Sequence, residues 1–248
     1  MSNPIALCAH GEAAWHAVAY ESLGAAWVDD GRLARAGRPA PRPLVEGRDL
    51  ASSVVPHRFL LGAVTLIPDA TVPDDVPGIV CDSWARLSLP GREAEPTGCW
   101  MIRAAGRPGA VPQVPGLEIR RVVTDADVAW FEYIAFLAAD GELPSRSGEL
   151  HPPGSQRLPG LTLLVAEIDG EGVGTALSVA TDRVNNIGAV TVMPAQRGRG
   201  IASQLAEAAV AAAPGVPATL SATVAGRGIY RRLGFNEVGR PLHHHPVD

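Results

Sequence analysis

The sequence predicts a mixed α/β protein in which a mostly antiparallel sheet is flanked by helices, with a second, smaller α/β lobe at the N-terminus. Three observations support this prediction. The chain has 248 residues and is 46% hydrophobic, which suffices for one large core or two small ones. In its second half, short apolar runs separated by turn signals precede a strand, a helix and a strand. Residues 104–116 are rich in Pro and Gly, as is typical of a linker.

The second half, residues 117–240, predicts one domain with a clear order of elements. Its first helix begins near Asp125 and ends before Gly141. Residues 141–160 hold too many Pro and Gly for regular structure, and a loop of this length is usually functional or disordered. The predicted strands are residues 117–123, 161–168, 173–180, 186–193, 218–223 and 235–240, and the two later helices are residues 198–213 and 226–233.

The first half, residues 1–103, predicts a separate lobe with a less regular pattern. Apolar residues at helical spacing run from Trp15 to Gly24, and a DG turn then joins two short extended pieces. The further predictions are a loop at residues 36–48, a strand at 58–67, a helix from Asp74 or Asp75 through Leu87, a strand at 99–103 and, after the second domain, a tail at 241–248.

Composition excludes several classes of protein. The net charge is only −5 and the basic residues are scattered, so we expect no nucleic-acid partner. Three widely spaced cysteines form neither a disulfide framework nor a zinc-binding pattern, which predicts a reduced, cytoplasmic protein without a metal. The N-terminus lacks the charged and apolar regions of a signal peptide, and no run of 18 apolar residues occurs, so we expect no membrane association.

All 21 basic residues are arginine. A phosphate-binding P-loop uses a lysine on the terminal phosphates, and pyridoxal chemistry needs a lysine amine. The absence of lysine therefore excludes both chemistries at their usual residue.

The strongest chemical signal follows the predicted strand at residues 186–193. The loop after Pro194 reads Gln196, Arg197, Gly198, Arg199 and Gly200, and a helix starts near Ile201. Alternate glycines leave backbone N–H groups uncovered, and the helix N-terminus adds partial positive charge, so the loop suits a pyrophosphate. A flexible loop with two solvated arginines is the alternative. A dinucleotide-binding fingerprint is disfavoured, because Ser203 stands where its last glycine belongs.

The wider sequence resembles a known family. Residues 190–210, VTVMPAQRGRGIASQLAEAAV, resemble the acyl-CoA-binding motif of the GNAT family of N-acetyltransferases, where a V-x-P strand leads through a basic RGxG loop into a helix. Residues 229–239, IYRRLGFNEVG, resemble that family's closing motif. The resemblance covers residues 117–240 and implies that acetyl-CoA is the cosubstrate. It also implies transfer of an acetyl group to a primary amine of a small molecule, by direct attack in a ternary complex. We expect a monomer or a homodimer.

The resemblance also implies roles for individual residues. Tyr230 would donate a proton to the leaving thiolate, although a core tyrosine that packs the helix on the sheet is the alternative. Thr223 and Gly226 stand where many members have asparagine and alanine, and Ala195 replaces a polar residue. The coenzyme would be bound by Val190, Thr191, Val192, Gln196, Arg197, Gly198, Arg199, Gly200, Ile201, Ala202, Thr223 and Gly226.

Attack by an amine requires a base, because a charged ammonium has no lone pair. The strand that often carries the family's carboxylate begins with Asn185 and Asn186 here. Two alternatives therefore stay open: a non-catalytic acyl-CoA sensor, and an acyltransferase that uses another acyl-CoA. The acceptor is also open, with Arg146, Glu149 and His151 as plausible contacts from the loop. No base is assigned, because each candidate has a solvated surface charge as its alternative. The candidates are Glu132, Glu149, His151, Glu167 and Asp182.

One heptad occurs almost twice, as GAVTLIP at residues 62–68 and GAVTVMP at residues 188–194. Our hypothesis is that the first half is a degenerate GNAT-like lobe, with a chance match between apolar strands as the alternative. The first copy continues into Asp69, Asp74 and Asp75, which would repel a diphosphate. We therefore expect this lobe to cover the sheet edge or to close one wall of the substrate cleft. The triplet His243 to His245 predicts a tail rather than a metal site.

Overall fold

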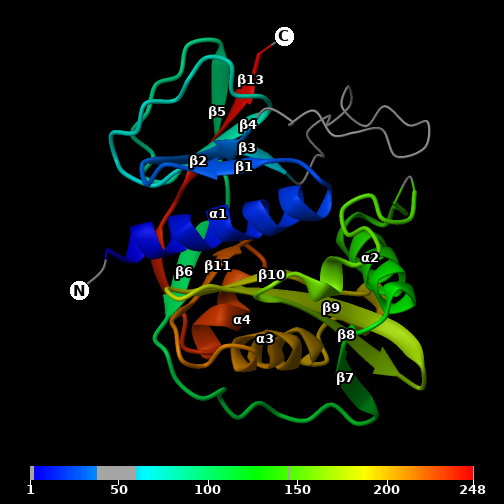
Figure 1. Cartoon of the computed structure of the whole chain (residues 1–248). Coiled ribbons are helices and arrows are strands. Elements are labelled where there is room, and N and C mark those ends of the chain that lie inside the picture. The colour runs from blue at the N-terminus through cyan, green and yellow to red at the C-terminus, as the bar shows by residue number, and fades with distance from the viewer. Residues whose placement is uncertain (1–2, 38–59, 145, 248) are drawn as a thin grey trace, which may run out of the picture.

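The computed structural model describes residues 3–37, 60–144 and 146–247, and these residues form two sheets with a long helix between them (Figure 1). The seven-stranded sheet has the order β12 (Asn236–Gly239), β6 (Cys99–Arg103), β11 (Ala218–Ala222), β10 (Asn185–Val192), β9 (Glu171–Ala180), β8 (Leu161–Ile168), β7 (Leu117–Arg121). The six-stranded sheet has the order β1 (Trp27–Asp29), β2 (Leu33–Ala36), β3 (Leu61–Thr65), β4 (Ile79–Asp82), β13 (Leu242–Pro246), β5 (Arg92–Pro96). Among the described strands only β10/β11 and β3/β4 pair in parallel, so the predicted mixed, mostly antiparallel, two-lobed fold is confirmed.

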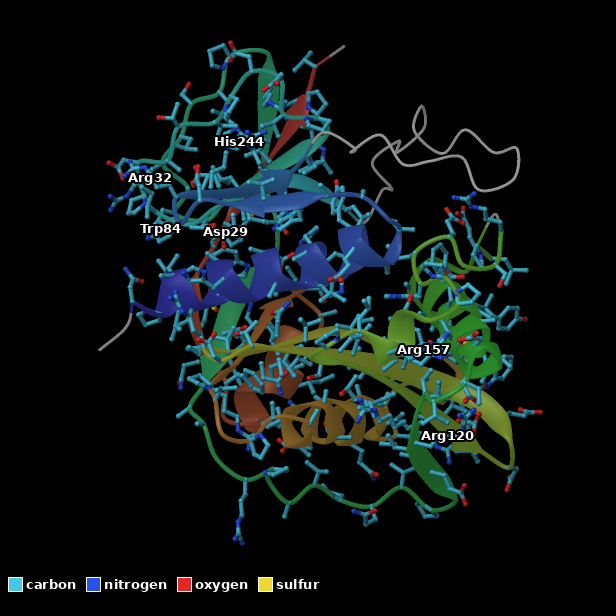
Figure 2. The ribbon with its side chains drawn as sticks, in the orientation of Figure 1. Asp29, Arg32, Trp84, Arg120, Arg157 and His244 are labelled. Atoms are coloured by element: carbon cyan, nitrogen blue, oxygen red, sulfur yellow. The ribbon has the colours of Figure 1, made fainter. Side chains whose placement is uncertain are left out.

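Each half of the chain places its last strand in the sheet of the other half. Strand β6 lies between β11 and β12, and β13 lies between β4 and β5. The predicted tail at 241–248 is therefore wrong for residues 242–246, which form β13, and β6, at the end of the predicted N-terminal lobe, pairs in the other sheet. Strands β4 and β11 would otherwise leave one edge without hydrogen bonds, and a strand from the other half satisfies that edge. His244, expected in a tail, is only 2% exposed inside the six-stranded sheet (Figure 2).

The two sheets repeat one arrangement. The order β1-β2-β3-β4-β13-β5 corresponds to β8-β9-β10-β11-β6-β12, and the exchanged strand holds the same place in both. The two copies of the heptad begin in β3 and β10, which are equivalent strands in this comparison. A chance match need not place the copies in equivalent strands, so the arrangement supports the duplication hypothesis.

Helix α1 (Pro4–Ser22) packs against both sheets, because it contacts β10, β11 and β6 on one side and β3 and β1 on the other. It is longer than predicted, since the Asn3 side chain accepts the N–H groups of Ile5 and Ala6 and Pro4 stands in the first turn. At Gly11 an added Cβ would lie 2.4 Å from Thr219 Oγ1. The glycine therefore lets the helix approach the seven-stranded sheet closely.

The other helices cover the two faces of the seven-stranded sheet. Helix α2 (Asp125–Asp140) lies on the same face as α1, and its start is fixed by a capping box between Thr124 and Asp127. Helix α3 (Ile201–Ala211) packs on the opposite face, and α4 (Arg227–Arg232) contacts α3. Two short 3-10 helices are η1 (Ser155–Arg157) and η2 (Pro194–Gln196). The helices and strands predicted for the second half are all present.

One prediction for the first half fails. The helix expected from Asp74 or Asp75 is absent, because Pro77 and Gly78 interrupt it and Asp82 instead accepts the N–H groups of Trp84, Arg86 and Leu87 in a turn. The strand expected at residues 58–67 is β3, with its first two positions outside the described residues. The loop expected at 36–48 also lies outside them, apart from its first residues.

The segment 104–116 is irregular but fixed to the domain. Val114 is buried, and the Pro112 carbonyl accepts a hydrogen bond from Gln204 on α3. Glu207, also on α3, accepts hydrogen bonds from Gly109 N–H and from the Arg103 guanidinium at 2.6 Å each. The predicted linker is thus a strap across α3. Within the described ranges none of the helices could serve as a transmembrane span, and no set of three or more His, Cys, Asp or Glu is arranged to hold a metal.

Candidate active site

The site begins where β10 and β11 separate. The two strands pair only at Asn185 and Asn186, at one end of β10. Farther along, β10 has a bulge against β9 between Gly188 and Thr191, with Ala189 at a φ of 47°. The side of β10 that faces β11 therefore has no ladder partner over residues 187–192, and this stretch includes the predicted coenzyme-binding residues Val190, Thr191 and Val192. The result is a gap in the sheet lined by strand backbone.

The loop at the end of β10 uncovers its backbone as the sequence predicts. Gly198 and Gly200 have φ values of 80° and 92°, a region that favours glycine. The N–H groups from Gly198 to Ala202 donate to no acceptor among the described residues, and α3 has no side-chain cap. Uncovered N–H groups and the positive end of a helix of 11 residues make this loop a site suited to an anion.

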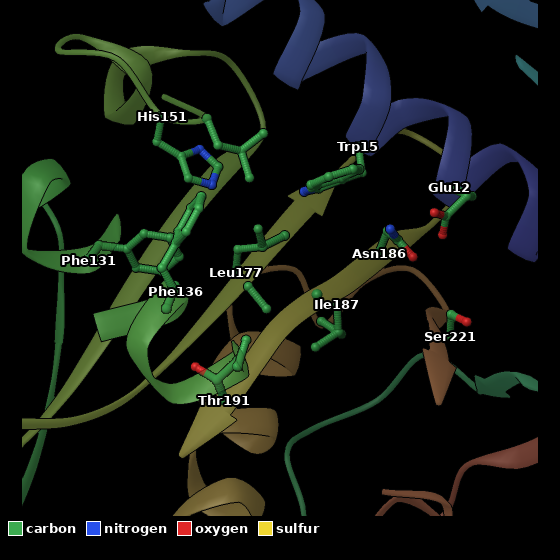
Figure 3. A pocket seen from close by; sticks show the side chains of 15 residues that line it. Glu12, Trp15, Phe131, Phe136, His151, Leu177, Asn186, Ile187, Thr191 and Ser221 are labelled. Atoms are coloured by element: carbon green, nitrogen blue, oxygen red, sulfur yellow. The ribbon is translucent and has the colours of Figure 1, made fainter. Parts of the chain in front are cut away.

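A cavity of about 290 Å³ lies on the other side of the gap, beneath α1 and α2 (Figure 3). Aromatic and aliphatic side chains form most of its wall, among them Trp15, Phe131, Phe136, Leu150, Leu177 and Ile187. The polar side chains are Glu12, His151, Asn186, Thr191 and Ser221. The gap thus connects an anion site on one side with a largely apolar pocket on the other.

Comparison with known proteins identifies this arrangement. Residues 159–237 match the family model of the acetyltransferase (GNAT) domain. This part of the chain therefore resembles a GNAT acetyltransferase domain. GNAT acetyltransferases use acetyl-CoA as cosubstrate, and the match is consistent with an acyltransferase. The matched residues include β10, the glycine loop and α3.

The GNAT fold extends over both halves of the chain. A GCN5-related N-acetyltransferase from Kribbella flavida superposes with a TM-score of 0.62 over 95% of each chain, at 15% sequence identity. A conserved protein of unknown function from Staphylococcus epidermidis gives 0.52 over 68% of this chain and 72% of that one, also at 15% identity. At these identities the likeness shows the fold alone. No curated protein matches the sequence.

The two arginines of the loop at the end of β10 differ in what they contact. Arg197 donates from Nε to the Val192 carbonyl at 3.1 Å and from Nη2 to the Ala138 carbonyl at 2.9 Å. It therefore joins the loop to β10 and to the C-terminal end of α2. Arg199 is exposed and donates to the Gln196 side chain, so it supplies the cation beside the uncovered N–H groups.

The remaining residues of the predicted site, Thr223, Gly226 and Tyr230, lie on α4 or just before it. The hydroxyl of Thr223 accepts the Gly226 N–H at 3.1 Å, which fixes the start of α4 and explains a threonine at this position. A Cβ at Gly226 would lie 3.3 Å from both Thr223 Oγ1 and Tyr230 Cε2. Tyr230 packs against the core and its ring lies 5.8 Å from that of Phe235. Burial raises the pKa of Tyr230 to about 12, so its hydroxyl keeps its proton at neutral pH.

Two of the carboxylates that the sequence offers as bases make structural contacts. Buried Glu132 accepts the N–H groups of Gly148, Leu150 and His151 at 2.6 to 2.9 Å and so fixes the loop beside the pocket. Arg120, labelled in Figure 2, lies on the edge strand β7 and pairs with Glu167, and the hydrogen bonds from Arg120 lower the pKa of Glu167. Exposed Asp182 and Arg146 and partly buried Glu149 do not line the pocket, whereas His151 does.

Sequence reasoning missed Glu12. Figure 3 shows this carboxylate, from α1 in the first half, beside Asn186 and Ser221. About 20% of its side chain is exposed, at the pocket, and no described group donates a hydrogen bond to it; His16 Nδ1 is 3.8 Å away. Burial raises the pKa of Glu12 to about 7. The available signal was a glutamate on the apolar face of a helix, but only the fold relates that face to the pocket.

Proposed function

We propose that this protein is an acetyl-CoA-dependent N-acetyltransferase that transfers the acetyl group to a primary amine of a small molecule by direct attack in a ternary complex. The observation that carries the proposal is the gap between β10 and β11, which joins the uncovered N–H groups of residues 198–202 to the pocket beneath α1 and α2. Acetyl-CoA bound in this gap would have its phosphates at the loop and its thioester carbonyl beside the pocket.

The residues present fit this cosubstrate. Over Val190 to Val192 the side of β10 that faces β11 has no strand partner, and it can offer hydrogen bonds to the amides of the pantetheine arm, as a neighbouring strand would. The N–H groups of residues 198–202 and the exposed Arg199 would bind the pyrophosphate, while Gln196 and Arg197 fix the loop. Thr223 and Gly226 would support the far wall through the start of α4.

In the proposed reaction the amine nitrogen bonds to the thioester carbon, and the carbon–sulfur bond breaks. The leaving sulfur takes a proton from Tyr230, whose raised pKa keeps that proton available. The nitrogen loses its surplus proton as the amide forms, and a proton from solvent restores the Tyr230 hydroxyl. All three cysteines are buried, and burial raises the pKa of Cys8 and Cys81, so no accessible thiolate competes as nucleophile. This supports direct attack rather than an acetyl-enzyme.

Release of free CoA from acetyl-CoA in the presence of a primary-amine panel tests the proposal, with coenzyme binding measured by calorimetry. We expect amine-dependent thiol release and an N-acetylated product. Tight binding without turnover over the whole panel would indicate an acyl-CoA sensor. Faster turnover with malonyl or longer thioesters would indicate another acyl donor, and an acetylated cysteine would contradict direct attack.

A further inference from the structure

The pocket is shared between the two halves of the chain. Glu12 and Trp15 project into it from α1, and the facing residues Asn186 and Ser221 belong to β10 and β11 (Figure 3). The position of α1 is fixed at this point, because a Cβ at Gly11 would lie 2.4 Å from Thr219 Oγ1 and 3.1 Å from Asn186 Oδ1. Glu12 is the next residue, so close packing holds its carboxylate over the place where the strands separate.

We propose that Glu12 binds the ammonium group of the acceptor and accepts its proton before attack, so that the first half of the chain completes the active site. This inference rests on the proposed acetyl transfer and names its missing base. Asn185 and Asn186 leave β10 without a carboxylate, and among the residues that line the pocket Glu12 is the one that has a carboxylate.

The surroundings of Glu12 suit proton exchange with an amine. The titratable groups that face it are His16 and Cys8 on α1 and Cys81 on β4, with His151 in the same pocket, and none of them is a fixed charge. An arriving ammonium would favour the ionised carboxylate, and the Trp15 indole would favour the cation further. The proton then moves from nitrogen to the carboxylate, the neutral amine attacks, and the carboxyl group returns the proton to solvent after product release.

The other residues that line the pocket limit the charge and polarity of the acceptor. Phe131, Phe136 and Leu177 form apolar walls, and no arginine lines the pocket among the described residues. A carboxylate or phosphate on the acceptor would be left without a cationic partner in an apolar environment, at considerable cost. The acceptor we expect is therefore a primary amine on an aromatic or similarly bulky apolar group that carries no anion.

The test compares Glu12→Gln with Glu21→Gln, an exposed position on the same helix. The substrate is 2-phenylethylamine, with phenylalanine as its anionic counterpart. For the unchanged protein we expect kcat/KM to rise with pH through about 7 and to favour 2-phenylethylamine. Glu12→Gln should lower kcat/KM by about 100-fold or more and remove this pH dependence, without changing acetyl-CoA affinity. Glu21→Gln should behave as the unchanged protein.

Binding of 2-phenylethylamine, followed by calorimetry without coenzyme, gives a readout independent of turnover. Glu12→Gln should weaken it, and Glu21→Gln should not. Normal turnover and amine binding in Glu12→Gln, or a preference for phenylalanine, would overturn this inference while leaving acetyl transfer intact. Absence of thiol release with every amine, despite acetyl-CoA binding, would instead overturn the proposed function. In that case amine binding that does not depend on Glu12 would overturn the inference as well.

Discussion

At the scale of single residues, the loop glycines act through backbone conformation. Gly198 has a φ of 80° with nothing within 4 Å of an added Cβ, and Gly31 in the turn between β1 and β2 has 82° with equally open space. A side chain at either position costs roughly 1–2 kcal/mol of backbone strain. Only a side chain at Gly198 would also lie beside the uncovered N–H groups.

We therefore expect Gly198→Asp to weaken acetyl-CoA binding by at least about tenfold, because like charges about 4 Å apart repel by ~4 kcal/mol before solvent screening. Gly31→Asp should lose a similar amount of stability and keep its affinity. Calorimetric titration and thermal unfolding of both variants check this, and unchanged binding in Gly198→Asp would refute the assignment of the loop.

Two neighbouring titratable groups on α1, His16 and Glu12, change the pH dependence of the free energy of unfolding in opposite directions. Burial lowers the pKa of His16 to about 3, so below pH about 6.5 the unfolded state binds a proton that the folded state does not. Stability at this site is lost as pH falls. Burial raises the pKa of Glu12 to about 7, so between about 4.5 and 7 the folded state binds the extra proton and stability is lost as pH rises.

These effects oppose one another between pH 4.5 and 6.5. In Glu12→Gln the His16 effect remains alone, and the free energy of unfolding should fall with decreasing pH more steeply than in the unchanged protein, by up to about 1.4 kcal/mol per pH unit. Urea unfolding across this range measures the slope. Equal slopes in Glu12→Gln and Glu21→Gln would show that the Glu12 carboxyl does not hold its proton.

At the scale of elements, the site depends on how α1 sits on the seven-stranded sheet. Because an added Cβ at Gly11 would collide with Thr219 Oγ1, Gly11→Ala should destabilise the fold by about 1–3 kcal/mol and displace Glu12. Thr219→Ala removes the colliding atom. In the double variant we expect the two losses in free energy of unfolding to be less than additive. Strict additivity would mean that the two residues do not limit the approach of α1.

At the scale of the whole molecule, the exchange of β6 and β13 couples the two halves. Each sheet contains, inside it, a strand from the other half, so neither sheet is complete without both. A chain that ends at Pro241 lacks β13, and we expect a lower unfolding temperature and weaker amine turnover, since α1 loses support. A chain that ends at Pro246 keeps β13 and should match the full chain.

The two halves should also unfold together. Tryptophan fluorescence and far-ultraviolet circular dichroism should give one coincident transition in urea, because opening either sheet removes a strand from the other. Two separated transitions would contradict this coupling.

Much of the second half could be predicted because its signals are local. The Asp125 helix start, the Asp169-Gly170 turn and the Gly198 to Gly200 loop each depend on conformations set within a few residues. The helix expected after Asp74 failed because a short turn around Asp82 competed with it. The sequence predicts a tail at residues 242–246 because their strand partners, β4 and β5, lie far away in the chain.

The sequence by itself therefore determined the antiparallel strands, the helices that cover them and the loop whose N–H groups are open to an anion, since backbone conformation and hydrophobic pattern encode these locally. Only the tertiary structure decided that the halves exchange strands and that Glu12 faces Asn186 and Ser221 in the pocket. The reason is physical: strand pairing and the desolvation of a carboxylate depend on contacts between residues far apart in the chain.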